Sequence, residues 1–397
     1  MFSARSGERA GELNALTRAL RARRRAGQPL LDLTLTNPTR AELPYDPDAL
    51  ASALARGARG GYDPQPRGLR SAREAVAARH AALGDRVDPD RVVLTASTSE
   101  AYGYLLTLLA DPGDAVLAPE PTYPLLPHLA ALASVRLRPY AMRYDGRWLP
   151  DAPEVFEAID ERTRAIIGVS PANPTGAILG PEEREGLAAF GLPLVLDEVF
   201  AAFPLEAASG VVSGGPPAGV LSFRLGGLSK LAGLPQHKLA WILVDGPEPQ
   251  VAAALERLDL IADTYLSVAT PVQRALPELL AATEAVRGAI RARCRRHLDE
   301  LRSLLTGTTA TVPRVEGGWV APLRVPATRS DEEWALACLE AGVLVHPGYF
   351  YDFPPDEAWL VVSLLTPPPA FQAGVERIAE VLDSAGGDGK RRRDGVG

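Results

Sequence analysis

The sequence alternates, from about residue 70, between helix-length amphipathic stretches and short apolar runs rich in β-branched residues. We predict a helix at LRSAREAVAARHAAL, a strand at VVLTA, a helix at SEAYGYLLTLLA and a strand at AVLAPE. Further strands are predicted at TRAIIGVS, PLVLDEVF and LAWILV. Short apolar strands separated by helices indicate an α/β fold with a largely parallel sheet covered on both faces. Because such sheets bind ligands at the carboxyl ends of their strands, we expect the functional residues there.

The pattern changes after residue 270. The segment PVQRALPELLAATEAVRGAIRARCRRHLDELRSLL predicts one or two long helices, and WVAPLRVP, VLVHPGYF and WLVVSLL suggest a smaller α+β unit that ends in a helix. The Pro-rich segment LTNPTRAELPYDPD is a poor helix and is expected to cross between domains. We predict four regions: an N-terminal segment of the small domain with the crossing arm (1–45), a large domain (46–275), a small domain (276–385) and a disordered tail (386–397).

Charge and cysteine content exclude several classes of function. The formal net charge is −7 and the basic run near the C-terminus is short, which argues against a nucleic-acid partner. The N-terminus has no apolar core of signal-peptide length and no later window approaches a membrane span, so we expect a cytoplasmic protein without a membrane partner. Cys294 and Cys338 lie far apart, without a CxxC or a His at metal spacing, so we expect neither a disulfide framework nor a metal site.

Lysine is rare in this chain. Of the 42 basic residues only Lys230, Lys238 and Lys390 are lysines, so the presence of a lysine rather than an arginine suggests a chemical role. Lys230 lies in the Gly-rich segment GGLSKLAGLPQHKLAW, just before a predicted strand. A lysine that forms a Schiff base must be deprotonated, and desolvation or a neighbouring cation such as Lys238 lowers its pKa. The alternative is a solvated loop cation, which the rarity of lysine disfavours.

An acidic pair ends the predicted strand PLVLDEVF, at Asp197 and Glu198. A carboxylate at the carboxyl end of a parallel strand can hold a protonated pyridine nitrogen and so make the ring an electron sink. The alternative is that Asp197 caps a helix. From this segment alone the two interpretations are equally good.

Two further segments carry polar residues directly after predicted strands. Ser97, Thr98 and Ser99 precede a helix start, where hydroxyls and free N–H groups form an anion site that suits a phosphate ester. A capping box between Ser97 and Glu100 is the alternative, and both can hold together. In VSPANPTGAIL, the amide of Asn173 can donate to a phenolate oxygen, and a plain Asn-Pro turn is its alternative.

In this order and at these separations, the four segments resemble the class I/II aminotransferases of pyridoxal 5'-phosphate (PLP) fold type I, the aspartate aminotransferase superfamily. The resemblance covers roughly residues 30–385. It implies a large PLP-binding domain with a mostly parallel mixed sheet flanked by helices, and a smaller α+β domain built from both chain ends. It also implies that Lys230 forms the aldimine, that Asp197 binds the pyridine nitrogen and that Asn173 donates to the ring oxygen. Residues 97–99 match the phosphate cup.

Two tyrosines gain a role only from this resemblance. Tyr123, in PEPTYP, matches the aromatic residue that stacks on the cofactor ring, and its alternative is a core tyrosine. Tyr62, in GYDPQPRGLRSAREAV, matches the tyrosine that such enzymes send into the neighbouring subunit to reach the phosphate. The resemblance therefore implies a homodimer with shared active sites.

The chain departs from the family at three positions. Lys238 stands where an arginine usually grips the phosphate, so the charge remains and the two-pronged contact is lost. Phe200 stands where a tyrosine often bonds the ring oxygen, which leaves that task to Asn173 and should raise the pKa of the aldimine. Val361, in WLVVSLL, replaces the arginine that pairs with the substrate's α-carboxylate.

The loss of that arginine leaves substrate binding open. The TNPTR segment matches the loop that lines the substrate mouth, so Asn37 and Arg40 are candidate substrate-binding residues, with an ordinary exposed arginine as the alternative for Arg40. A second possibility is a substrate without a free α-carboxylate, such as an amine, an ester or a thioester.

The expected function is transfer of an amino group from an amino acid donor to a keto acid or aldehyde acceptor. In this reaction Lys230 would act as the general acid and base. Two alternatives stay open. A β-lyase or decarboxylase could use the same cofactor, since Val361 alters the group that orients the substrate, and a non-catalytic binding protein could retain the fold.

Overall fold

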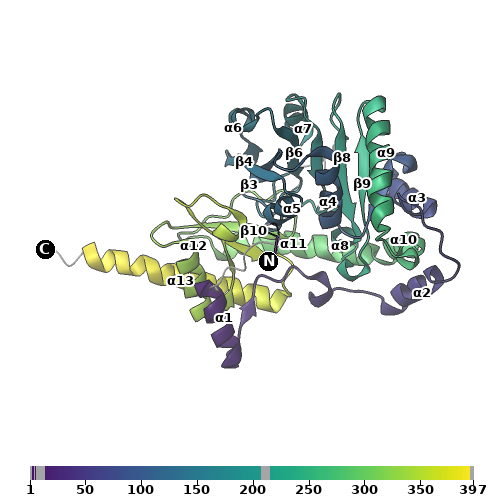
Figure 1. Cartoon of the computed structure of the whole chain (residues 1–397). Coiled ribbons are helices and arrows are strands. Elements are labelled where there is room, and N and C mark those ends of the chain that lie inside the picture. The colour runs from purple at the N-terminus through teal and green to yellow at the C-terminus, as the bar shows by residue number, and fades with distance from the viewer. Residues whose placement is uncertain (1, 4, 6–13, 207–214, 394–397) are drawn as a thin grey trace.

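The computed structural model describes residues 2–3, 5, 14–206 and 215–393, and for residues 385–393 only the backbone. Its largest element is an eight-stranded sheet (Figure 1) with the order β2 (Val92–Thr95), β9 (Ala240–Asp245), β8 (Ser222–Gly227), β7 (Leu194–Asp197), β6 (Thr163–Val169), β3 (Ala115–Glu120), β4 (Arg136–Tyr144) and β5 (Trp148–Pro150). The central pairs from β8 to β4 are parallel, whereas β9 is antiparallel to both β2 and β8, and β5 is antiparallel to β4. The prediction of a mostly parallel mixed sheet is confirmed.

Helices cover the large sheet on both faces, as the unbroken apolar runs of its strands require. The helices and short 3-10 turns of this part are α2 (Pro47–Gly57), α3 (Arg70–Ala81), η3 (Pro89–Arg91), α4 (Thr98–Leu109), α5 (Leu126–Leu132), α6 (Ala152–Ala158), α7 (Pro181–Ala188), α8 (Leu228–Leu231), η4 (Pro235–His237), α9 (Glu248–Tyr265) and α10 (Thr270–Ala282). One apolar core joins the central strands with α4 and α9, and a second joins β2 and β9 with α2, α3 and α10.

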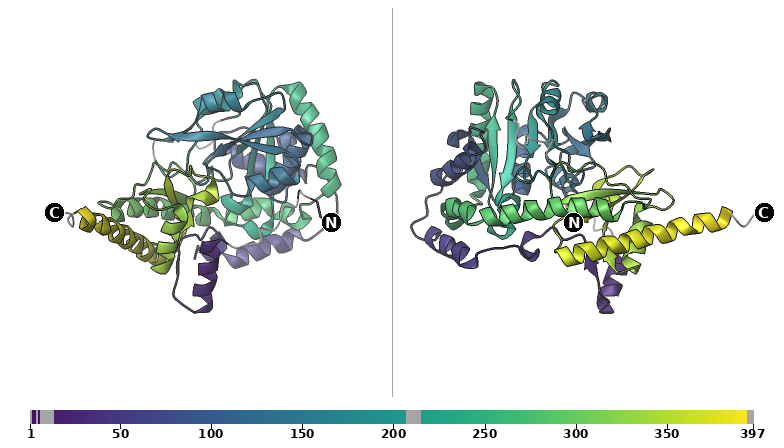
Figure 2. Two further views of the ribbon diagram at one scale, coloured as in Figure 1. Left: turned by 60° about the vertical axis from the view of Figure 1, so that its left-hand side comes forward. Right: turned by 180° about the vertical axis from the view of Figure 1, so that it is seen from behind.

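A smaller unit contains both ends of the chain. It consists of α1 (Ala15–Arg25), β1 (Leu31–Asp32), η2 (Pro38–Arg40), α11 (Glu284–Leu304), β10 (Val320–Val325), α12 (Asp331–Glu340), β11 (Val343–Leu344), β12 (His346–Pro347), η5 (Gly348–Tyr351), β13 (Ala358–Ser363) and α13 (Pro368–Arg393). β13 lies between β10 and β12, antiparallel to both, and β1 pairs in parallel with β11. The right-hand view of Figure 2 shows α11 running beneath the large sheet, with α13 below it.

Two details sharpen the predictions from sequence. The long helical segment after residue 270 forms two helices, α10 and α11, which meet at the buried Thr283. Helix α13 continues to Arg393, into the segment predicted as a disordered tail, because a packed helix propagates at little cost into residues that have no core of their own. Residues 394–397 of that tail lie outside the described residues.

The segment 33–46 connects the two units. Leu33 is packed in the core of the small unit. Tyr45 contacts that core and also the core formed by β2, β9 and their helices, and its hydroxyl donates a hydrogen bond to the carbonyl of Gly233 (2.7 Å). Within the described residues, no helix combines the length and apolar character needed to cross a membrane.

Candidate active site

Lys230 lies on the short helix α8, directly after β8. The two glycines before that helix let β8 run close to β9: a Cβ on Gly226 would lie 2.6 Å from Trp241 Nε1, and one on Gly227 would lie 2.9 Å from Ala240 Cβ. The Nζ atom of Lys230 lies 5.1 Å from the ring centroid of Trp319 and 5.5 Å from that of Phe200. Two aromatic rings therefore form part of the surroundings of this partly buried side chain.

Burial lowers the pKa of the Lys230 ammonium, and the charge of Asp197 opposes that shift only in part. Lys238, the cation that the sequence suggested as a cause, is exposed and does not contribute to the shift. Lys230 is therefore shifted toward the neutral amine that Schiff-base chemistry needs, by desolvation rather than by a neighbouring cation.

Asp197 ends β7 and is 8% exposed. Its Oδ2 accepts a hydrogen bond from the Tyr102 hydroxyl (3.1 Å) and its Oδ1 accepts one from the Val199 N–H (3.2 Å). Burial raises the pKa of Asp197 to about 6, although both hydrogen bonds oppose the shift. The residues that follow form a turn, so the alternative in which Asp197 caps a helix is wrong. This carboxylate is suited to binding a cationic or N–H group.

Sequence reasoning missed Tyr102 and Trp319. Tyr102 is four residues after Thr98 on α4, so helical periodicity puts both on one face, and this spacing could have indicated it. Trp319 follows the pair Gly317 and Gly318 before β10, and nothing in its local sequence indicates that it lies against Lys230. Contacts between units distant in sequence determine that part of the site.

The start of α4 has the geometry of a capped helix. Ser97 Oγ accepts from the N–H of Glu100 (3.1 Å), and Glu100 Oε2 accepts from the N–H of Ala96 and the hydroxyl of Ser267 (2.6 Å each). The capping interaction expected for Ser97 is therefore present. The first N–H groups of a helix have no intrahelical partners. Ser97, Thr98 and Ser99 at the start of α4 therefore remain able to hold an anion.

Asn173 and Thr122 carry polar atoms without partners. Asn173 follows β6, and its Oδ1 is buried with no hydrogen-bond partner among the described residues; the same is true of Thr122 Oγ1. The turn after Asn173 needs Gly176, whose φ is 72° and whose Cβ position lies 2.8 Å from the Gly317 carbonyl. Buried polar atoms are normally paired, so two unpaired ones near the same strand ends indicate a ligand.

Tyr123 is adjacent to Thr122 and is 36% exposed. Partial burial and the charge of Asp197 both raise the pKa of the Tyr123 hydroxyl, which places this side chain within electrostatic reach of the Asp197 carboxylate. The structure therefore brings Lys230, Asp197 and Tyr123 together.

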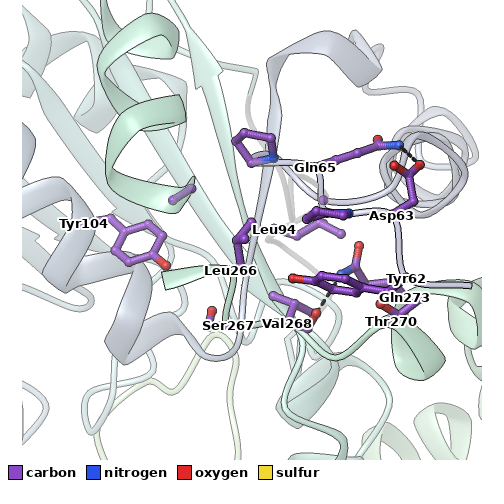
Figure 3. Close-up of a pocket in the computed structure, with 14 residues that line it drawn as sticks. Tyr62, Asp63, Gln65, Leu94, Tyr104, Leu266, Ser267, Val268, Thr270 and Gln273 are labelled. Atoms are coloured by element: carbon purple, nitrogen blue, oxygen red, sulfur yellow. Dashed lines mark hydrogen bonds between the residues drawn. The ribbon is translucent and has the colours of Figure 1, made fainter. Parts of the chain in front are cut away.

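Tyr62 does not join this group within the chain. Its ring is 72% exposed and lines a small pocket with Tyr104, Ser267, Val268 and other residues, as Figure 3 shows. Of the site residues described above, this pocket shares Ser267, which donates to Glu100 at the start of α4; Lys230, Asp197, Asn173 and Tyr123 do not line it. Lys238 is also exposed, in the left-handed conformation (φ 49°) that ends η4.

The substrate candidates lie beside the small sheet. Ser363 donates from its N–H to the Leu33 carbonyl (2.6 Å) and from its Oγ to the Leu35 carbonyl (2.5 Å), so the segment before η2 runs along the end of β13. Asn37 and Arg40 are both exposed there. Asn37 Oδ1 caps η2 by accepting from the N–H of Thr39 (3.1 Å).

Val361 is 1% exposed in β13, with Pro322 and His346 opposite it on the neighbouring strands. His346 Nδ1 lies 2.8 Å from the Tyr351 hydroxyl, and the Tyr351 carbonyl accepts from the Thr122 N–H (2.9 Å). The position that the resemblance assigns to an arginine is thus occupied by an apolar residue. On the neighbouring strands it faces Pro322 and His346, and burial lowers the pKa of His346.

The family model of aminotransferase class I and II matches residues 29–378, most of the chain. The chain belongs to this family. Among curated aminotransferases, the alanine aminotransferase of Mycobacterium tuberculosis is 28% identical over 270 residues, which span 66% of this chain and 62% of the relative. The glutamate-pyruvate aminotransferase of Escherichia coli is 27% identical over 269 residues, which span 66% of this chain and 65% of the relative. The aligned part is therefore less than two thirds of these relatives.

Solved aminotransferase structures show the same fold. An alanine aminotransferase from Pyrococcus furiosus superimposes with a TM-score of 0.84 at 22% identity, over 97% of this chain and 100% of that one. An aspartate aminotransferase from Thermus thermophilus gives 0.80 at 25% identity, over 96% and 100%. The expected fold type I is confirmed, and class I aminotransferases of this fold use PLP.

Proposed function

We propose that this aminotransferase-family chain uses PLP to move an amino group from an amino acid donor to a keto acid or aldehyde acceptor. The observation that carries the proposal is the environment of Lys230: a buried amine between two aromatic rings, with a lowered pKa, on the helix that follows β8. Such an amine can attack a carbonyl near neutral pH, whereas a solvated lysine is protonated.

The residues present fit the cofactor. Asp197 is a buried carboxylate whose only hydrogen-bond donors among the described residues are Tyr102 and the backbone of Val199, and it would hold the pyridine nitrogen. The side-chain amide N–H of Asn173 would donate to the ring oxygen, and Tyr123 would lie against the ring. Residues 97–99 at the start of α4, with Lys238, would hold the phosphate.

When bound, PLP supplies the electron sink for the negative charge that develops at the substrate Cα. The protein's part is proton transfer and positioning. Lys230 Nζ would take the proton from Cα and deliver it to the cofactor side, which requires an amine of tuned pKa. Phe200 and Trp319 exclude water around Nζ, and Tyr102 fixes the orientation of the Asp197 carboxylate.

We also propose a homodimer in which Tyr62 of one subunit reaches the phosphate site of the other. Tyr62 is 72% exposed and Leu260 and Tyr265 are 74% and 65% exposed, an unusual set of large apolar side chains for a free surface. We also propose the division into a large domain (46–275) and a small domain (276–385, with residues 1–45); it is supported by the apolar core that joins residues from both chain ends, such as Leu16 and Phe371. Both cysteines are buried free thiols, which supports a cytoplasmic location.

For the substrate we propose an amino acid whose carboxylate is bound by Arg40 rather than at position 361. Val361 offers no charge, whereas η2 puts Arg40 at the end of β13, exposed and without an ion-pair partner among the described residues. The relatives named above act, by their names, on alanine and on glutamate with pyruvate.

The test is to load the purified protein with PLP and mix it with alanine, glutamate, aspartate, tyrosine and simple amines. A donor that is used should convert the cofactor absorption band to the pyridoxamine form, and an added keto acid should restore it with a new amino acid as product. The Lys230→Ala variant is the control. Ammonia with pyruvate would instead indicate a β-lyase, carbon dioxide a decarboxylase, and failure to take up PLP a non-catalytic protein.

A further inference from the structure

A cavity of about 450 Å³ lies behind the candidate active site, between the large sheet and the helices α3 and α11. We call it the arginine cavity. Its walls are residues of α3, the turn after β7, strands β8 and β9, and the first two turns of α11. Lys230 and Asp197 do not line it, but their sequence neighbours Leu231 and Glu198 do. The cavity is therefore separate from the cofactor site and shares its walls.

Four guanidinium groups line the arginine cavity: Arg79 from α3, Arg224 from β8, and Arg287 and Arg291 from α11. Two of them are strongly buried, because Arg224 is 1% and Arg287 is 5% exposed. Like charges gathered in a cavity repel one another and are costly unless something neutralises them.

The carboxylates of the wall neutralise this set only in part. Glu198 and Glu284 are the two acidic residues among the lining residues. Glu198 is bound by Arg184, a residue outside the lining (2.7 Å), and also lies 4.0 Å from Arg224 Nη1, whereas Glu284 pairs with Arg287. The acids of the wall are thus already engaged.

Arg224 is compensated mainly by carboxylates outside the cavity. Asp85 accepts from its Nη1 (2.6 Å) and Asp245 from its Nε (3.0 Å). Its Nη2, however, is buried and has no hydrogen-bond partner among the described residues. Arg224 lines the cavity and is almost completely buried, so its Nη2 group is a buried donor without a partner among the described residues.

Arg79 and Arg291 have no carboxylate partner among the residues that the structure describes. Arg79 Nε is also buried without a hydrogen-bond acceptor. Burial and the charges of Arg79 and Arg291 lower the pKa of Arg287 to about 10, which shows that the three groups are close enough to repel one another. Since Glu284 offsets Arg287, the partly buried Arg79 and the exposed Arg291 are the two cations of the wall without a carboxylate partner among the described residues.

We propose that the arginine cavity binds a small oxyanion with at least two negative charges, either phosphate or a small polycarboxylate. Its oxygens would accept from the unpaired N–H groups of Arg79 and Arg224 and offset the charge of Arg291. Charge-assisted hydrogen bonds from guanidinium groups are the strongest available to such a ligand. Its volume admits an anion of the size of citrate as well as phosphate. The cavity also adjoins the Lys230 helix, because Arg287 Nη1 donates to the Leu231 carbonyl (3.5 Å).

The proposal is tested by titrating the PLP-loaded protein with inorganic phosphate and, separately, with citrate in a calorimeter, at constant ionic strength set with chloride. Loading with PLP first fills the cofactor phosphate site. We expect one ion to bind per chain, and whichever anion binds more tightly identifies the class. Heats no larger than those of chloride for both anions would overturn the proposal.

Two variants locate the bound anion. The double variant Arg79→Gln/Arg291→Gln should weaken binding about tenfold or more, because two charged hydrogen-bond donors are lost. It should also unfold at an equal or higher temperature without anion, since it removes repulsion. Arg296→Gln is the control: it removes one positive charge from α11 outside the cavity and should leave binding unchanged.

A third variant changes the charge of the wall in the opposite direction, and it distinguishes a loss of anion binding from a loss of folding. Glu284→Gln removes an acidic group from the rim and should tighten binding several-fold, because the net positive charge of the wall increases. Weaker binding in Glu284→Gln, or equal binding in the double variant and in Arg296→Gln, would contradict the assignment.

Discussion

The edge of the large sheet and the facing side of the small sheet differ in how closely their residues match the sequence motifs of the family. At the edge of the large sheet, Lys230, Asp197 and Asn173 match the motifs of the family in sequence, and their polar atoms suit the cofactor contacts proposed for them. On the small sheet, Val361 is buried among apolar neighbours where the family has an arginine. The cofactor is the same throughout the family, so its contacts are constrained, whereas the substrate side is free to change.

The same contrast predicts how substitutions will behave. Changes on the large-sheet side should remove chemistry, because each residue there serves a specific group of the cofactor. Changes on the small-sheet side should alter which substrate binds and leave the reaction intact. Four predictions test this, in order of decreasing effect.

The largest effect is expected from Lys230→Ala. This substitution removes both the amine that attaches PLP and the group that transfers the proton, so amino transfer should fall by about 10⁴-fold or more. Single-turnover kinetics with the preferred donor measure this loss. Lys390→Ala, near the C-terminus, is the matched control and should retain full activity; a Lys230→Ala variant within tenfold of the parent would break the comparison.

Asp197→Asn should reduce turnover by about 10²–10³-fold, because the carboxylate that stabilises the cationic ring is lost. A second readout uses the protein without cofactor. The pKa of Asp197 is raised from 3.8 to about 6, so the folded state keeps a proton that the unfolded chain releases. The stability from this group is fully present below pH about 4 and is lost as pH rises through about 6, a change of about 3 kcal/mol.

Urea unfolding of the cofactor-free protein at pH 4.5 and at pH 7.5 measures that change. Relative to the parent, Asp197→Asn should gain stability as the pH rises between these values. If the difference between the two proteins is independent of pH, the carboxylate is not buried as described.

Arg40→Ala tests the small-sheet side. If Arg40 binds the substrate carboxylate, KM for amino acid donors should rise about 10–100-fold, because a charged hydrogen bond is lost. The value of kcat should be almost unchanged. Arg257→Ala, which removes an exposed arginine of α9, is the control. An unchanged KM for amino acids, with efficient use of simple amines, would show instead that the substrate lacks a free carboxylate.

Phe200→Tyr should have the smallest effect. Its ring lies 5.5 Å from Lys230 Nζ, and a hydroxyl there could donate to the ring oxygen of PLP. The pH midpoint of the cofactor absorption change should fall by up to about one unit, because the hydrogen bond favours the deprotonated form. No shift, with PLP still bound, would mean that residue 200 does not face that oxygen.

The sequence predicted the fold and the large-sheet residues for a physical reason. Parallel strands bring their carboxyl ends to one edge, so polar residues placed after strands, such as Asp197 and Asn173, converge there whatever the loops do. Tyr102 could have been predicted as well, because it lies one helical turn after Thr98 on α4.

The remaining contacts depend on packing between segments that are distant in sequence. Trp319 meets Lys230 only because the small unit docks on the large sheet, and the surroundings of Val361 involve three strands. The arginine cavity joins residues of α3, β8 and α11, and no local motif marks it. Helical propagation into residues 386–393 likewise depends on the packed part of α13 rather than on local composition.

The central claim is that Lys230 carries the cofactor, and the rarity of lysine makes a direct measurement possible. The protein is incubated with PLP, reduced with borohydride, digested and examined by mass spectrometry for a pyridoxyl group on lysine. With only Lys230, Lys238 and Lys390 in the chain, each can be read separately. We expect one label per chain on Lys230; an unlabelled Lys230, or equal labelling of Lys238 or Lys390, would show that Lys230 does not carry the cofactor.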